Sequence, residues 1–315
     1  MSSQEKKLRG IRINEIYGPT FQAEGPFSGY KTLFLRTSGC NLRCHGWGVE
    51  TELPDGTVVT GCDTPRAVFP QLYKGTPFRQ PEEIVEDLKK KDDVKRVCLT
   101  GGEPLFGDKA SINALLDLLY EEGYVVDVFT NGTQDFSKFL EVDSERRGSK
   151  RENVNFVVDF KMPGSGEYNS DDAKSIKQGK VFLYENVKYL RPTDAVKFVI
   201  KDRHDFDVAV QEYHEIKQYL DEEQKSTPPQ FFAGAVFGLM DNDTLMDWVL
   251  ETRVPFQFQF QEHKYNSNLD QKELENRLDL PIAEVTHSGH GRKANKNLLT
   301  NIRGSEKYEG PKHGQ

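Results

Sequence analysis

Apolar runs alternate with amphipathic segments along most of the chain. Apolar or alternating runs predict strands at residues 11–16, 32–36, 94–100, 124–130, 154–160, 195–200, 231–237 and 255–260. Segments with apolar residues on one face predict helices at residues 81–90, 112–122, 207–220 and 243–252. Gly18-Pro19 and Gly25-Pro26 predict turns between the first two strands.

The order of these elements predicts the fold class. Strands and helices alternate from about residue 30 to about residue 260, which is typical of βαβ units and a parallel sheet. Because the strand–helix pairs are fewer than a closed barrel needs, we predict an α/β fold: a partial, open β/α barrel with a mainly parallel sheet. The core domain should span residues 1–265, with a hairpin insertion at about 46–61. A loose polar C-terminal extension at 266–315, with a short helix at 274–280, should follow.

Composition and charge narrow the class of protein. The net charge of −8 argues against a nucleic-acid partner, which would require a basic face. Residues 1–9 are polar, without the apolar segment of a signal peptide, and no apolar run is long enough to cross a membrane. We therefore expect a cytoplasmic protein with no membrane partner, whose four cysteines bind metal or do chemistry rather than form disulfides.

Three of these cysteines lie close together in the chain. Cys40 and Cys44 follow the strand at residues 32–36, and Cys62 comes after a predicted hairpin that turns at Pro54-Asp55-Gly56. Three thiolates on a 4Fe–4S cubane would leave one iron open to bind and reduce S-adenosylmethionine (SAM). The alternative is a structural zinc site that adds His45 or Cys98 as a fourth ligand. Cys98 lies within an apolar strand, so we expect it in the core.

Other polar residues follow the ends of predicted strands. The motif from Thr100 through Gly101 and Gly102 to Glu103 follows one strand, where bare backbone groups and a carboxylate could hold an amino group. An ordinary strand–helix turn would use glycines equally well. Further candidates, each with a structural alternative as turn, salt bridge or core residue, are Asn131, Asp159, Lys161, Gln261 and His263.

Taken together, these motifs resemble a known family. The cysteines, Cys62-Asp63-Thr64 and Thr100–Pro104 resemble the radical SAM superfamily. The stretches at 15–25, 34–36, 159–166, 197–200 and 261–264 resemble 7-carboxy-7-deazaguanine synthases, which make the deazaguanine skeleton in queuosine biosynthesis. The superfamily usually spaces its cysteines C-x3-C-x2-C, whereas residues 45–61 separate Cys44 from Cys62 here. Ala23 stands where glycine is usual, and the family usually ends soon after its histidine motif.

The resemblance implies a reaction and its cofactors. The enzyme would be a carbon–nitrogen lyase that converts 6-carboxy-5,6,7,8-tetrahydropterin to 7-carboxy-7-deazaguanine with loss of ammonia. It would use a 4Fe–4S cluster, catalytic SAM and Mg²⁺. Its implied partners are this small pterin substrate, an electron donor such as flavodoxin, and a second copy of the chain in a homodimer.

The resemblance also implies roles for individual residues. Cys40, Cys44 and Cys62 would bind the cluster, and Thr64 would bind Mg²⁺. The SAM contacts would be Thr100, Gly101, Gly102, Glu103, Asn131, Asp159 and Lys161. The substrate contacts would be Gln22, Glu24, Gly25, Arg36, Gln261 and His263, with Arg36 on the substrate carboxylate.

Two other functions remain open at this stage. Another radical SAM enzyme, such as a glycyl-radical activase, would keep the cysteines and the Gly101-Gly102 motif but would not need Glu24, Arg36 and His263 around a small pocket. A zinc-stabilised nucleic-acid-binding protein would need a basic face, against which the net charge of −8 counts.

Overall fold

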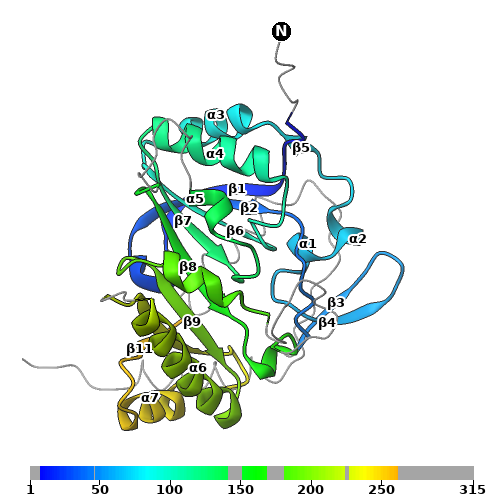
Figure 1. Cartoon of the computed structure of the whole chain (residues 1–315). Helices are drawn as coiled ribbons and strands as arrows, with labels where there is room; N and C mark the ends of the chain where they lie inside the picture. Colours follow the sequence, from blue (N-terminus) through cyan, green and yellow to red (C-terminus); the bar gives the residue numbers. More distant parts are fainter. Residues whose placement is uncertain (1–7, 46, 141–150, 169–180, 224–226, 262–315) are drawn as a thin grey trace, which may run out of the picture.

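The computed structural model describes residues 8–45, 47–140, 151–168, 181–223 and 227–261. Its main feature is a nine-stranded sheet in the order β11-β10-β9-β8-β7-β6-β2-β1-β5. The strands are β1 (Ile11–Phe21), β2 (Lys31–Thr37), β5 (Phe78–Arg79), β6 (Arg96–Gly101), β7 (Val125–Thr130), β8 (Val154–Phe160), β9 (Ala195–Ile200), β10 (Gln230–Ala235) and β11 (Gln257–Gln259). Figure 1 shows how they follow one another across the molecule.

The sheet is mainly parallel and open. Neighbours from β2 through β6 to β11 all pair in parallel, whereas β1 pairs antiparallel with β2 and β5. Strands β11 and β5 occupy opposite ends of the strand order, so the sheet does not close into a barrel. The predicted partial, open β/α barrel is therefore confirmed.

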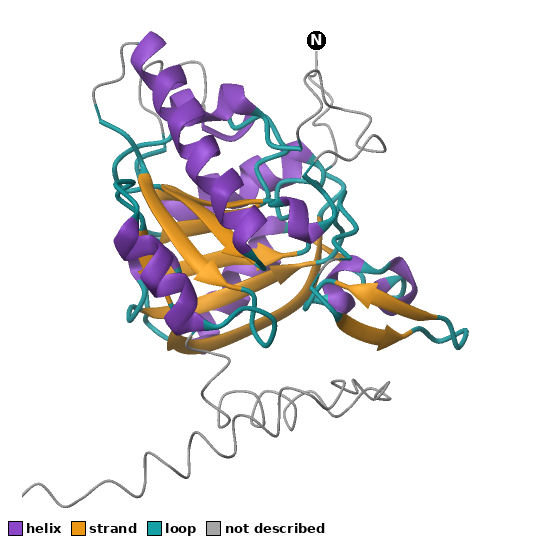
Figure 2. Ribbon diagram, turned by 90° about the horizontal axis from the view of Figure 1, so that it is seen from below, coloured by secondary structure: helices purple, strands orange, loops and turns teal. Residues whose placement is uncertain are grey.

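Four longer helices cover the apolar face of the sheet, and Figure 2 shows helices packed along it. They are α3 (Pro81–Lys91), α4 (Lys109–Glu121), α6 (Arg203–Glu222) and α7 (Asn242–Glu251). Each of the last three begins after an aspartate whose carboxylate accepts a backbone N–H of the first turn: Asp108, Asp202 and Asp241. The described part of the chain holds no helix with the length and apolar character of a membrane span.

The remaining short elements lie in the connections. They are the helices α1 (Pro65–Val68), α2 (Pro70–Tyr73) and α5 (Ser137–Leu140), and the 3-10 turns η1 (Gly25–Phe27), η3 (Pro163–Ser165) and η4 (Tyr184–Tyr189). Strands β3 (Val49–Glu52) and β4 (Val58–Gly61) form an antiparallel hairpin between Cys44 and Cys62. This hairpin projects away from the main sheet in both views (Figures 1 and 2).

One predicted turn is wrong. Gly18-Pro19 lies inside β1, which continues to Phe21, and the register with β2 shifts between Tyr17 and Thr20. A bulge of this kind accommodates glycine and proline in a strand because it interrupts the ladder locally. The predicted helix at 274–280 lies outside the described residues.

The two faces of the sheet have different chemistry. Residues such as Leu35, Leu99, Val158 and Phe198 belong to the large apolar core beneath the helices. Because side chains alternate along a strand, their neighbours in sequence point to the opposite face. That face carries the polar side chains Arg36, Asp127, Asp159, Lys197 and Gln259. It is the inner face of the open barrel and leads to the candidate site.

Candidate active site

The cysteine loop begins directly after β2 and packs against the end of β6. The Gly39 N–H donates to the Ala67 carbonyl at 2.7 Å, and the Glu103 N–H donates to the Gly39 carbonyl at 2.8 Å. A Cβ added to Gly102 would lie 2.2 Å from the Gly39 oxygen. The second glycine of the motif therefore lets β6 approach the backbone just before Cys40, which no larger residue would permit.

The hairpin brings Cys62 back beside Cys44. A Cβ on Gly61 would lie 2.3 Å from the Cys44 carbonyl oxygen, so the two segments cross in close contact. Burial raises the pKa of each of the three thiols to about 12, and each thiol is also affected by the charge of another in the group. The three sulfur atoms therefore share one buried environment, where iron binding would displace their protons.

Lys161 supplies positive charge within this environment. Its Nζ pairs with an Asp159 oxygen at 3.0 Å and lies 4.4 Å from the centroid of the Trp47 ring. Burial lowers the pKa of Lys161, but the charges of Asp159, Cys44 and Cys62 outweigh it, so the pKa is raised. A lysine that stays protonated here can balance the negative charge of thiolates.

Glu103 joins the ends of β6 and β7. Its carboxylate accepts hydrogen bonds from the Leu105 N–H at 3.0 Å, the Thr130 hydroxyl at 2.7 Å and the Asn131 N–H at 2.6 Å. Burial raises its pKa to about 7 against these lowering hydrogen bonds. Asn131, also expected at the site, directs its Nδ2 to the Asn41 side chain at 3.2 Å and to the Cys40 sulfur at 3.9 Å.

The inner face holds the candidate substrate residues. The Arg36 guanidinium pairs with Glu15 at 2.6 Å and donates to the Tyr17 hydroxyl oxygen at 3.2 Å, and these two contacts fix its orientation. Glu24 forms a buried ion pair with Lys197. Gly25 has a positive φ of 73°, and a Cβ there would lie 3.3 Å from Val157. The loop after β1 therefore lies against the inner face of β8.

Two buried acceptor atoms on this face have no hydrogen-bond partner among the described residues. They are Asp159 Oδ1 and Gln259 Oε1. A buried polar atom without a partner destabilises the fold, and native proteins usually supply one. Each of these acceptors can bind a donor of a polar ligand on the inner face.

Several residues at the site were not expected from the sequence. Lys197 belongs to a stretch that carried the family resemblance but received no role. The alternation of side chains along a strand could have placed it on the face opposite Val196 and Phe198. Gln259 could have been found in the same way from β11. Glu167, which contacts the cysteine loop, follows η3 and carries no periodic signal.

Of the two C-terminal substrate candidates, Gln261 lies within the described residues. Gln261 follows β11 and is half-buried. His263 lies outside the described residues.

Thr64 lies beside Cys62: its N–H donates to the Cys62 sulfur at 3.4 Å and its hydroxyl lies 3.2 Å from Asp63 Oδ1.

Cys98 differs from the three clustered thiols. It is 2% exposed, which confirms that it is a core residue, and because Val97 and Leu99 face the helices it lies on the inner face of the sheet. After burial, the main influences on its pKa are Asp127, Gln22 and Arg36 rather than another thiol. The His45 ring, the other proposed zinc ligand, lies against Gly166, where a Cβ would come within 2.1 Å of it.

The spacing of the ligands also bears on the choice between zinc and iron. Within the described ranges, no three His, Cys, Asp or Glu side chains gather closely enough to hold a single metal ion. A cubane binds each thiolate through a different iron, so its ligands stand farther apart than those of one zinc.

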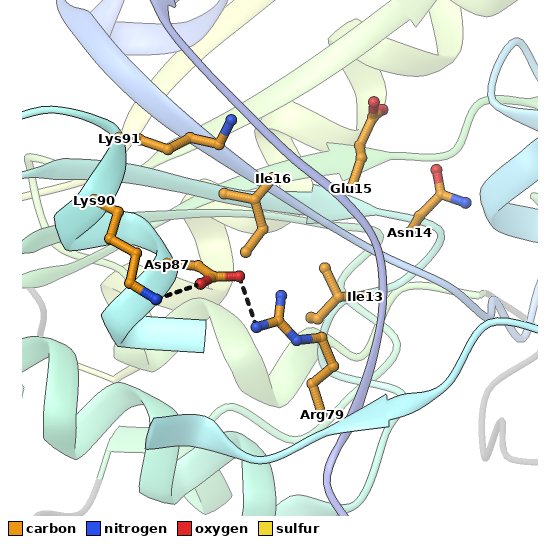
Figure 3. Close-up of a pocket in the computed structure, with 8 residues that line it drawn as sticks. All are labelled: Ile13, Asn14, Glu15, Ile16, Arg79, Asp87, Lys90 and Lys91. Carbon is orange, nitrogen blue, oxygen red and sulfur yellow. Dashed lines mark hydrogen bonds and ion pairs between the residues drawn. The ribbon is translucent and has the colours of Figure 1, made fainter. Parts of the chain in front are cut away.

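A surface pocket of about 400 Å³ lies elsewhere, between β1, β5 and α3. Figure 3 shows Asp87 in it, bonded to Arg79 at 2.7 Å and to Lys90 at 3.3 Å. Its lining contains none of the cysteines, and it touches the candidate site only through Glu15, the partner of Arg36. The pocket is therefore separate from the chemistry described above.

Comparison with known proteins agrees with the cysteine geometry. Residues 25–179 match the family described as a 4Fe-4S single cluster domain. A 7-carboxy-7-deazaguanine synthase of Thermoplasma acidophilum is 33% identical over 198 residues, which cover 63% of this chain and 74% of the relative. One of Methanospirillum hungatei is 28% identical over 258 residues, covering 81% of this chain and 85% of the relative. The crystal structure of QueE from Escherichia coli covers 79% of this chain and 93% of its own, with a TM-score of 0.49 and 17% identity.

The open α/β sheet and the iron–sulfur domain define a radical SAM enzyme, a lyase that uses a 4Fe–4S cluster and SAM. Within that class, the chain belongs to the 7-carboxy-7-deazaguanine synthase family.

Proposed function

We propose that this enzyme converts 6-carboxy-5,6,7,8-tetrahydropterin to 7-carboxy-7-deazaguanine with loss of ammonia, and that Mg²⁺ assists it. The names of the relatives and the polar inner face support the proposal. The observation that carries it is the pair of buried acceptors Asp159 Oδ1 and Gln259 Oε1, which have no partner among the described residues. A pterin offers ring donors and acceptors that can satisfy both amide and carboxylate groups.

The residues around Arg36 fit a small anionic substrate. Arg36 would bind the substrate carboxylate, since a guanidinium held by Glu15 and Tyr17 presents donors in a fixed orientation. Glu24, held by Lys197, would accept hydrogen bonds from the pterin ring. Gly25 would let the loop approach the ring, and Gln22, Gln261 and His263 would complete the contacts.

Cys40, Cys44 and Cys62 would hold the cluster, which when bound supplies the electron that cleaves SAM to a 5′-deoxyadenosyl radical. Lys161, buried between Asp159 and the thiols, would offset their negative charge. Asn131 lies against the Cys40 sulfur and would orient the same end of the site. Thr100, Gly101, Gly102 and Glu103 would contact the methionine part of SAM.

Thr64 is the proposed protein ligand of Mg²⁺. Its hydroxyl lies 3.2 Å from Asp63 Oδ1, and hydroxyl and carboxylate oxygens are ligands that this hard cation prefers. Water and the substrate carboxylate would complete the octahedron. Thr64→Ala should therefore reduce activation by Mg²⁺ while SAM still binds.

We also propose that the enzyme is a homodimer, which light scattering on the purified chain would test. It would take electrons from a donor such as flavodoxin. The chain would divide into a core at residues 1–265 and an extension at 266–315.

The decisive experiment is a product assay. Anaerobically reconstituted enzyme should form 7-carboxy-7-deazaguanine from the tetrahydropterin under reducing conditions, and Mg²⁺ should stimulate it. The matched control is Cys62→Ala in the same assay. A brown, cluster-containing enzyme that cleaves SAM but yields no deazaguanine would reject the proposed substrate and leave the radical SAM assignment in place.

A further inference from the structure

The segment after β8 forms hydrogen bonds to the cysteine loop on both sides of Cys44. The Arg43 N–H donates to Glu167 Oε1 at 2.5 Å, and the His45 N–H donates to the Ser165 carbonyl at 3.0 Å. These two backbone bonds flank a proposed cluster ligand directly. A hydrogen bond to a carboxylate is stronger than one between neutral groups, so the Glu167 contact is the stronger of the two.

Glu167 is itself held rigidly. Its side chain is buried, with the residue 7% exposed, and its own N–H donates to the Ser165 hydroxyl at 3.1 Å. The same segment is fixed to α6, because the Gly164 N–H donates to Asp205 Oδ1 at 2.7 Å. The Tyr168 hydroxyl bonds Glu212, which is also on α6. The position of Glu167 therefore depends on a helix of the main fold.

The charge of Glu167 also reaches the thiols. Its Oε1 accepts the N–H of Arg43, so the carboxylate lies next to the residue that precedes Cys44. Glu167 is not among the candidate contacts for SAM, substrate or metal. A buried carboxylate beside an iron–sulfur cluster opposes addition of an electron, and the net charge near a cluster is one of the factors that set its potential.

We infer that Glu167 is a positioning residue that fixes the Cys44 segment and keeps the reduction potential of the cluster low. A low potential is what reductive cleavage of SAM demands. The inference rests on the three-cysteine site proposed above.

The charge is tested with Glu167→Gln, which keeps an oxygen to accept the Arg43 N–H and removes the negative charge. The reconstituted variant should retain its iron. A redox titration followed by electron paramagnetic resonance measures the reduction potential of the cluster. In the variant this potential should rise by about 59 mV, which is a tenfold shift of the one-electron equilibrium toward the reduced cluster. The control, Glu185→Gln, makes the same change at an exposed position on η4 and should leave the potential unchanged.

The positioning role is tested with Glu167→Ala, which removes charge and acceptor together. Iron release to a chelator should be about tenfold faster than from the wild type, with the circular dichroism spectrum unchanged. Wild-type potential in Glu167→Gln, or wild-type iron release in Glu167→Ala, would overturn the inference. Absence of a cluster from the wild-type chain would instead reject the three-cysteine site, so the two failures are distinguishable.

Discussion

The two ends of the parallel strands bury polar groups differently. At the amino ends, the Arg96 guanidinium lies over the rings of Phe27 and Tyr30, 4.4 and 4.8 Å from their centroids. It donates to both oxygens of Asp127, at 2.8 and 2.6 Å. Asp127 also accepts from Asn155 at 2.9 Å. Each charge here has a protein partner.

At the carboxyl ends, Lys161 pairs with Asp159 and Glu103 accepts three hydrogen bonds, but the pairing of polar groups is less complete. Three thiols with raised pKa values lie beside Lys161, and Asp159 Oδ1 and Gln259 Oε1 are buried without a partner in the described part of the chain. A fully satisfied polar network stabilises a fold, whereas unsatisfied buried groups destabilise it unless a ligand binds them. The paired charges at the amino ends therefore stabilise the fold, whereas we expect the thiols and acceptors at the carboxyl ends to bind cofactor and substrate.

The largest contrast should come from the cysteines. Cys62→Ala removes one of three proposed ligands, so the chain should lose its cluster and all activity. Cys98→Ala removes a more deeply buried thiol that lies apart from the group and should keep full iron content. Iron analysis and the visible spectrum after anaerobic reconstitution measure both. Full iron in Cys62→Ala would remove it from the ligand set.

Breaking the network at the amino ends should destabilise the fold. Arg96→Met keeps the apolar stem but leaves Asp127 buried without its cation, which should cost about 3–5 kcal/mol of unfolding free energy. Urea unfolding measures this. Lys89→Met breaks an exposed pair with Glu122 and should leave the midpoint unchanged. Equal effects of the two variants would contradict a stabilising network.

Glu103 should make stability depend on pH. Its pKa is raised by burial from 4.5 to about 7, so between these values the unfolded chain has lost a proton that the folded chain keeps. The free energy of unfolding should therefore fall as pH rises from 4.5 to 7, by about 3 kcal/mol, and then level off.

The variant Glu103→Gln isolates this contribution. It should be less stable overall, because its amide NH₂, a donor, would face the Asn131 N–H, which is also a donor. It should nevertheless lack the fall in stability above pH 4.5. Urea midpoints of both proteins across this range supply the test. A parallel pH dependence in wild type and variant would assign the slope to other groups.

The smallest effect should come from an unsatisfied atom at the carboxyl ends. Gln259→Leu removes the buried, unpartnered Oε1 and should raise unfolding free energy by about 1 kcal/mol. It should also raise KM for the pterin about tenfold, since a ligand contact is lost. Gln257→Leu, on the same strand but exposed, is the control. Higher stability without a change in KM would place Gln259 outside the substrate site.

Much of the fold followed from local patterns. The predicted strands at 154–160 and 195–200 coincide with β8 and β9, and the predicted helices at 81–90 and 243–252 agree with α3 and α7 within a residue or so. These elements are amphipathic or uniformly apolar, which periodicity detects. The short α1 and α2 were not predicted, because four-residue helices carry too few positions to establish a period.

The chain by itself determined the order of strands and helices, the alternation that sends Asp159 and Lys197 to one face, and the cysteine pattern that resembles its family. Only the tertiary structure decided how distant segments meet: Gly61 crossing Cys44, Glu167 accepting from Arg43, and Lys197 pairing with Glu24 across 173 positions. Secondary structure depends on neighbours in sequence, whereas these contacts depend on how the whole sheet folds and which backbone surfaces it brings together.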